Sequence, residues 1–261
     1  MVHFVGAGSG AVDLITVRGS ELLSKADVVI YAGSVINKKL LKYCRDNAAL
    51  YDSSALTLEA VIKIIKDADD AELETVRLHS GDPSVYGAIR EQIDELCKLK
   101  IDYDITPGVT AAMAAAASLG MEFTLPGITQ SFVITRMPGR TDVPEAESIE
   151  RFVSTGASVA VYLSTGLAGD LTERLINAGM PGDAPAAVVY KASWEEEKRM
   201  ICSLGTLSDR LKEEGIQGLA VILLGPALKQ LTDDGAYERS RLYDPAFSTG
   251  YREAAKRIEP E

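Results

Sequence analysis

The chain has little of what metal, disulfide and membrane proteins are built from. Its 261 residues include three cysteines and two histidines, and no apolar run approaches the ~20 residues that cross a bilayer. Cys44, Cys97 and Cys202 lie far apart and are odd in number, so they fit neither a metal-ligand spacing nor a disulfide framework. The first residues show no basic stretch followed by an apolar segment, which is the mark of a secretory signal. We therefore expect a cytoplasmic protein with no bound metal and no membrane contact.

Positive charge is also scarce. The chain carries 27 Lys and Arg against 38 Asp and Glu, for a formal net charge of −11 at pH 7, and its basic residues are not clustered. Proteins that bind nucleic-acid backbones usually carry the opposite sign. We therefore expect no nucleic-acid partner, although a few convergent arginines can still bind a small anionic molecule.

Apolar runs and helical patterns predict an α/β fold with two domains. In the first part, strands are expected at residues 2–5, 28–31, 75–79 and 103–106, with helices at 13–26, 58–66 and 86–99. This alternation is typical of a parallel sheet. Later strands are expected at residues 131–135, 158–163, 186–191, 199–203 and 219–224. The close pair 186–191 and 199–203 favours a hairpin and hence a mixed sheet. We expect an N-terminal domain at 1–112, a C-terminal domain at 113–235 and a tail at 236–261.

Three glycine-bearing loops follow strands of the expected parallel sheet. They span residues 6–10, 80–87 and 107–111. Ligands of open α/β sheets bind at the carboxyl ends of the strands, so these loops predict a cleft floor of backbone and small side chains for a flat or extended ligand. Plain strand-to-helix turns are the alternative, in which Asp82 caps a helix that has Pro83 at its first position.

The first loop also invites comparison with dinucleotide-binding proteins. Its glycines follow the spacing G-x-G-x-G rather than G-x-G-x-x-G, and the acidic residue about twenty positions on, Asp27, precedes the second strand. The chain has no H-E-x-x-H, Walker or G-x-S-x-G motif, which argues against a zinc enzyme or a serine hydrolase. A nicotinamide-dependent oxidoreductase and a non-catalytic ligand carrier stay open as alternatives.

Together the three loops resemble those of the tetrapyrrole (corrin/porphyrin) methyltransferase family, whose members use S-adenosylmethionine (SAM). The segments Tyr31-Ala32-Gly33-Ser34, Gly139-Arg140-Thr141 and Leu242-Tyr243-Asp244-Pro245 are similar to the branch that methylates C-11 of precorrin-4 or cobalt-precorrin-4. The resemblance implies two α/β domains with the active site in the cleft between them, S-adenosylhomocysteine as a product, and a homodimer. Ser9 stands where the family usually has proline, and Ala11-Val12 where it often has Asp-Pro.

The resemblance also implies site residues. Those implied for SAM are Ser9, Ser80, Gly81, Asp82, Val85, Thr110, Ala111, Leu163 and Ala192. Because the implied substrate carries many carboxylates, Arg136 and Arg140 are the expected substrate-binding residues, with solvated surface arginines as the alternative. No catalytic residue is assigned. Alternatives within the same fold methylate another corrin position, a protein side chain as diphthine synthase does, or a ribosomal nucleotide.

Overall fold

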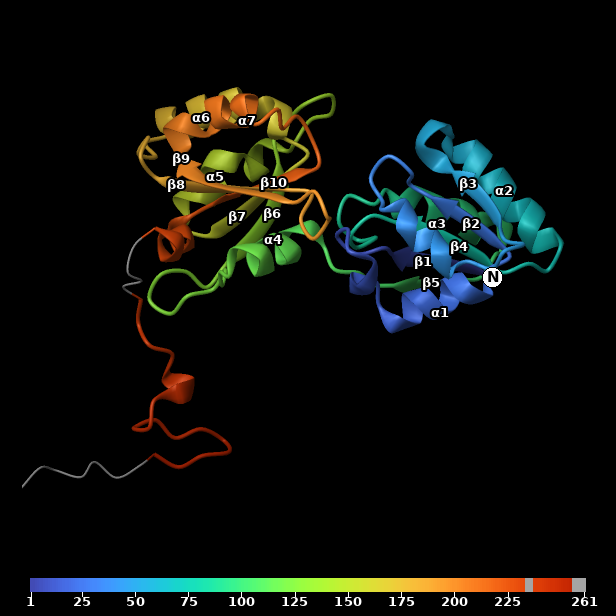
Figure 1. The fold of residues 1–261 in the computed structure, drawn as a ribbon, viewed down its shortest axis with the longest axis horizontal. Coiled ribbons are helices and arrows are strands. Elements are labelled where there is room, and N and C mark those ends of the chain that lie inside the picture. The colour runs from blue at the N-terminus through green and yellow to red at the C-terminus, as the bar shows by residue number, and fades with distance from the viewer. Residues whose placement is uncertain (233–236, 255–261) are drawn as a thin grey trace, which may run out of the picture. The chain divides into compact units, whose positions relative to one another are not determined.

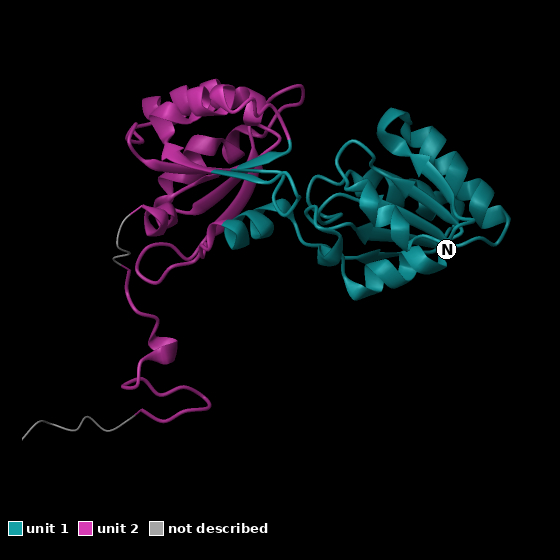
Figure 2. Ribbon diagram, in the orientation of Figure 1, with its two compact units in different colours: residues 1–118, 189–199, 219–221 teal, residues 119–188, 200–218, 222–261 magenta. Residues whose placement is uncertain are grey.

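The computed structural model describes residues 1–232 and 237–254, which form two compact units (Figure 2). Unit 1 contains residues 1–118, 189–199 and 219–221, and unit 2 contains the rest. The domain limits expected from the sequence stay a prediction, and the limit at 235/236 falls on residues outside the described part of the chain.

Unit 1 is built on a parallel sheet (Figure 1). Its strands are β1 (Val2–Gly6), β2 (Val28–Tyr31), β3 (Ala49–Asp52), β4 (Thr75–His79) and β5 (Tyr103–Thr106). They lie in the order β3-β2-β4-β1-β5, and all four neighbouring pairs are parallel, which confirms the predicted sheet. Since β1 lies between β4 and β5, the loops that follow these three strands meet at one edge.

Helices cover both faces of this sheet. They are α1 (Val17–Lys25), α2 (Leu58–Asp70) and α3 (Ile89–Leu99), and a fourth helix, α4 (Ala111–Leu119), follows β5 in the chain. On one face, Ile65 of α2 and Leu96 of α3 pack in one cluster with Phe4 of β1. On the other, Leu23 of α1 packs in a cluster with Val5 of β1. Each of α1, α2 and α3 buries one stripe of apolar side chains, so the sheet is apolar on both sides, as parallel sheets are.

Two features of unit 1 differ from the sequence expectation. The edge strand β3 was not predicted, because Leu50 and Tyr51 are 45% and 39% exposed and do not form a buried run. The helix expected at 86–99 begins only at Ile89, since Tyr86 and Ala88 have left-handed φ angles of 56° and 49°. Residues 82–88 are therefore a tight loop, and Asp82 does not cap a helix.

The second sheet combines parallel and antiparallel pairs. Its strands are β6 (Phe132–Arg136), β7 (Ser158–Tyr162), β8 (Pro185–Tyr190), β9 (Lys198–Ser203) and β10 (Ala220–Leu224), in the order β6-β7-β10-β8-β9. β6 is parallel to β7, whereas β7 is antiparallel to β10, which confirms the predicted mixed sheet. The accompanying helices are α5 (Ile149–Ser154), α6 (Ala168–Asn177) and α7 (Leu207–Glu213). Both sheets together confirm the α/β class.

Candidate functional site

The three glycine loops of unit 1 meet through their backbones. A Cβ atom built at Gly6 would lie 2.6 Å from the nitrogen of Gly108 and 2.7 Å from the carbonyl oxygen of Gly81. A Cβ built at Gly108 would lie 2.1 Å from that same oxygen. The amide of Gly81 donates to the carbonyl of Gly8 at 2.9 Å, and the amide of Gly8 donates back at 3.2 Å. No side chain fits between the loops, so they form one surface of main chain.

Asp82 joins the second loop to the third. Its Oδ2 accepts a hydrogen bond from the amide of Gly108 at 2.9 Å, and its Oδ1 accepts from the amide of Ser84 at 2.8 Å and from the Ser84 hydroxyl at 2.5 Å. Burial would raise the pKa of Asp82, but the hydrogen bonds from Ser84 and Gly108 outweigh it and hold the pKa below its usual value. Asp82 is therefore a carboxylate at neutral pH, fixed in place by its own chain.

Unit 1 contains every residue expected to contact SAM except Leu163. Ser9 belongs to the first loop, Ser80, Gly81, Asp82 and Val85 to the second, and Thr110 and Ala111 to the start of α4. Ala192, which is 4% exposed, belongs to the distant segment 189–199 that is part of unit 1. The structure thus brings residues from four stretches of the chain into one compact unit.

Contacts to the first loop come from residues that the sequence patterns did not single out. The indole Nε1 of Trp194 donates to the carbonyl of Ser9 at 2.9 Å, and the side-chain amide of Asn37 donates to the carbonyl of Gly10 at 2.9 Å. Trp194 is the sole tryptophan of the chain. Its position directly after Ala192 and Ser193 is the only sequence signal that could have drawn attention to this contact.

In unit 2, the remaining expected residues follow the neighbouring parallel strands β6 and β7. Arg136 of β6 is paired with Tyr162 of β7, directly before Leu163. The hydroxyl of Ser164 accepts from the amide of Met137 at 2.8 Å and so joins the two strand ends. Leu163 has a left-handed φ of 54° and is 73% exposed, an uncommon state for a large apolar side chain. This edge therefore presents side chains rather than main chain.

The two arginines at this edge differ in their partners. The Arg136 guanidinium donates to the carbonyls of Met137 at 3.2 Å, Thr141 at 3.0 Å and Asp142 at 2.6 Å, so it holds its own loop. Arg140 is exposed and has no hydrogen-bond or ion-pair partner among residues 1–232 and 237–254. Of the two, Arg140 is the one whose charge is available to an anionic ligand.

Two basic side chains lie buried on β4, just before the second loop. Arg77 is 7% exposed and donates to Gln92 Oε1 at 3.1 Å and to the carbonyl of Ile30 at 3.2 Å. Burial lowers the pKa of Arg77 to about 10, so it stays charged. Burial, and then the charge of Arg77, lower the pKa of His79 to about 3. His79 is therefore neutral at pH 7, and its buried Nε2 has no hydrogen-bond partner in the part of the chain that the structure describes.

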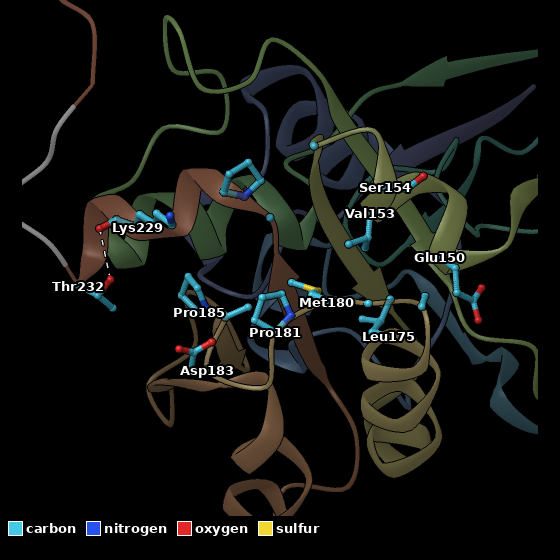
Figure 3. A pocket seen from close by; sticks show the side chains of 16 residues that line it. Glu150, Val153, Ser154, Leu175, Met180, Pro181, Asp183, Pro185, Lys229 and Thr232 are labelled. Atoms are coloured by element: carbon cyan, nitrogen blue, oxygen red, sulfur yellow. Dashed lines mark hydrogen bonds between the residues drawn. The ribbon is translucent and has the colours of Figure 1, made fainter.

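Unit 2 also has a cavity of about 720 Å³ (Figure 3). Its wall includes the apolar side chains of Val153, Leu175 and Met180 and the exposed Lys229. Glu150, which also lines it, is held by Arg174 at 2.5 and 2.9 Å. None of the residues expected from the sequence lines this cavity, so the candidate site is located by the loops and not by the cavity.

The position of Asp27 argues against a dinucleotide site. Its carboxylate accepts from the amide of Glu74 at 3.0 Å and from Arg45, before the start of β2 and thus at the edge opposite to the loops. Within the described residues, no three His, Cys, Asp or Glu side chains gather to hold a metal ion. Nor does any helix described here have the length and apolar character needed to cross a membrane.

Comparison with known sequences gives a full-length match. The family model of Tetrapyrrole (Corrin/Porphyrin) Methylases matches residues 1–208. The cobalt-precorrin-4 C(11)-methyltransferase of Methanocaldococcus jannaschii is 42% identical over 257 residues, which cover 98% of each chain. The precorrin-4 C(11)-methyltransferase of a Sinorhizobium species is 40% identical over 96% of this chain and 98% of its own length.

Solved structures of methyltransferases also match this chain. The X-ray structure of a cobalamin biosynthetic enzyme, cobalt precorrin-4 methyltransferase, matches with a TM-score of 0.85 and 39% identity over 87% of this chain and 95% of its own. The uroporphyrin-III C-methyltransferase of Thermus thermophilus, solved with S-adenosylhomocysteine, matches with a TM-score of 0.72 at 23% identity, over 88% of this chain and 99% of its own. At that identity the second match shows the fold alone.

Proposed function

This chain belongs to the tetrapyrrole (corrin/porphyrin) methylase family, and on that basis we propose that it transfers a methyl group from SAM to carbon C-11 of precorrin-4 or cobalt-precorrin-4, a step of cobalamin biosynthesis. The observation that carries the proposal is the match to relatives named for this position, at 42% and 40% identity over 98% and 96% of the chain. A uroporphyrinogen-III C-methyltransferase of Priestia megaterium is 30% identical over 86% of the chain, which favours the C-11 branch over that one.

The residues of unit 1 fit SAM as the methyl donor. The main-chain surface leaves no room for a side chain at Gly6 or Gly108, so a ligand beside these residues meets backbone donors and acceptors. Such groups can hydrogen-bond both a zwitterionic amino acid and an adenine edge. The residues we propose to hold the donor are Ser9, Ser80, Gly81, Asp82, Val85, Thr110, Ala111 and Ala192, with the exposed Leu163 of unit 2 as a contact for an apolar ring face.

The chain's own task in this reaction is orientation. When bound, SAM supplies a methyl group on a positively charged sulfur, which needs no protein nucleophile. Asp82 holds the second and third loops together, because its carboxylate accepts hydrogen bonds from Ser84 and Gly108. It therefore acts as a positioning residue. Holding two reactants in line can contribute roughly 7–11 kcal/mol to a rate enhancement. No proton transfer by the chain is required for the methyl group to move.

Basic side chains are needed for the substrate, because it carries many carboxylates while the chain has a net charge of −11. Arg140 supports this role through its exposure and its lack of a partner in the described part of the chain. Arg136 is instead bonded to three carbonyls of its own loop, so we propose that it shapes the loop that presents Arg140.

We propose further that the protein is a homodimer in the cytoplasm. The family resemblance supports the dimer, and sedimentation analysis of the purified protein tests it. Cys44, Cys97 and Cys202 are all free, which supports a reducing compartment.

Calorimetric titration with S-adenosylhomocysteine, with NADH in parallel, tests the choice of cofactor. We expect micromolar binding of S-adenosylhomocysteine alone. Binding of NADH alone would contradict the methyltransferase and favour an oxidoreductase. Tight binding of a tetrapyrrole without any methyl transfer would favour a ligand carrier instead.

A further inference from the structure

The segment 191–197 is strained and lies far in sequence from the loop it contacts. Lys191 and Ser193 have left-handed φ angles of 47° and 69°, which are unfavourable for residues other than glycine. Between them lies the buried Ala192. Strained residues persist only where surrounding contacts hold them, and such positions cluster at functional sites.

The contacts that surround Ser193 and Trp194 include several to the first loop. The hydroxyls of Ser193 and Ser9 share a hydrogen bond of 2.8 Å, and the amide of Ala11 donates to the Ser193 hydroxyl at 3.0 Å. The indole of Trp194 donates to the carbonyl of Ser9 at 2.9 Å. A Cβ atom built at Gly10 would lie 1.9 Å from Cδ1 of Trp194, so the indole ring fills the space beside that glycine.

The segment is in turn fixed at its other end by Glu197. One carboxylate oxygen accepts from the amide of Ser193 at 2.6 Å, and the other accepts from the hydroxyl of Ser118, in α4, at 2.5 Å. Arg199 lies 3.7 Å from the same carboxylate and donates to the carbonyl of Ser118 at 2.9 Å. Glu197 thus joins the segment to the helix that follows the third loop.

From these contacts we propose that Ser193 and Trp194 are positioning residues that hold the first loop in the shape that binds the methyl donor. Such support matters because Gly6, Gly8 and Gly10 lose more conformational freedom than other residues when the loop is ordered. Ser9, which stands where the family usually has proline, supplies the hydroxyl that Ser193 bonds. The inference rests on the proposed function for the identity of the ligand and adds to it a loop support from residues distant in sequence.

Because Trp194 is the sole tryptophan of the chain, its fluorescence can report ligand binding at the first loop without an added label. We expect titration of the wild-type protein with S-adenosylhomocysteine to change the emission of Trp194. Ser193→Ala and Trp194→Phe are expected to weaken binding about threefold to tenfold in calorimetry, the effect of losing one or two hydrogen bonds. Ser24→Ala is the matched control, since Ser24 is an exposed residue of α1 that bonds only within its helix, and it should bind as the wild type does.

Amide hydrogen exchange of the ligand-free proteins separates this inference from the proposed function. Ser193→Ala should speed exchange in residues 6–14 while leaving the melting temperature close to that of the wild type. Unchanged exchange there would overturn the inference, as would wild-type affinity in both variants, and neither result would touch the proposed function. If the wild type itself does not bind S-adenosylhomocysteine, the proposed function fails, and the exchange data alone decide whether Ser193 holds the loop.

Discussion

In unit 1, three loops touch through glycine backbones, and the closest approach leaves a hypothetical Cβ at Gly108 only 2.1 Å from Gly81. In unit 2, the corresponding strand ends present the exposed Leu163 and Arg140, and among the described residues the nearest atom to a Cβ at Gly139 would belong to Leu167, at 3.6 Å. The loops of unit 1 therefore pack through main-chain atoms, whereas the strand ends of unit 2 present side chains to a ligand. The unit 1 edge should not tolerate an added side-chain atom at Gly6 or Gly108, and the unit 2 edge should tolerate substitutions that change only binding.

The largest difference between the two edges is expected when one methyl group is added to each. Gly108→Ala must push apart three backbones, so we expect it to destabilise unit 1 by about 3 kcal/mol and to weaken S-adenosylhomocysteine binding about a hundredfold. Gly139→Ala places its methyl group at ordinary contact distance and should leave both properties unchanged. Urea unfolding and calorimetry measure the two effects. Equal behaviour of the two variants would contradict the backbone account of the unit 1 edge.

The two units also differ in the basic side chains that they bury. The buried basic side chains, Arg77 and His79, belong to unit 1. Because the pKa of His79 is lowered to about 3 in the folded protein, the unfolded chain binds the extra proton between about pH 6.5 and 3, and stability falls as pH falls through that window. From pH 7 to pH 5 this residue should remove about 2 kcal/mol.

His79→Phe tests that expectation, because it deletes the titrating group at a site that already lies 5.9 Å from the ring of Phe4. Urea unfolding at pH 7 and pH 5 should show a loss of stability that is smaller in the variant by about 2 kcal/mol. The same loss in both proteins would show that His79 is not the group responsible.

Arg140 and Arg136 of unit 2 should differ in their effects, because the first is proposed to bind the substrate and the second to hold its own loop. Arg140→Gln removes a charge with no partner in the described part of the chain, so we expect the KM for the tetrapyrrole to rise about tenfold, with unchanged stability and unchanged S-adenosylhomocysteine affinity. Arg136→Gln removes hydrogen bonds to three carbonyls and should lower the free energy of unfolding by about 1 kcal/mol. Steady-state kinetics and urea unfolding would reveal the reverse pattern if the roles were exchanged.

The smallest expected effect concerns the strained leucine. Leu163→Gly relieves a left-handed φ of 54° and should raise stability by up to about 1 kcal/mol, while weakening S-adenosylhomocysteine binding about fivefold if it removes the proposed apolar contact. Lys100→Gly is the control, since Lys100 has a φ of 60°, is exposed, and lies at the end of α3 before β5, at the edge opposite to the glycine loops. It should show the gain in stability without the loss in affinity. A loss of affinity in both would refute a specific role for Leu163.

The sequence patterns predicted those features that depend on residues close together in the chain. Short apolar runs located β1, β2, β4 and β5, and the glycines after three of these strands located the loops that meet at Gly6, Gly81 and Gly108. The left-handed residues Tyr86 and Ala88 escaped prediction, because apolar spacing carries no record of φ. The contact of Ser193 with Ser9 spans 184 positions, and no local pattern specifies a partner at that distance.

Methyl transfer to precorrin-4 and to cobalt-precorrin-4, followed by NMR with SAM labelled with ¹³C in its methyl group, tests the central claim most directly. We predict one labelled methyl group, attached to carbon C-11 of at least one of the two substrates. Label at any other ring carbon, or no transfer by a protein that binds S-adenosylhomocysteine, would contradict the account.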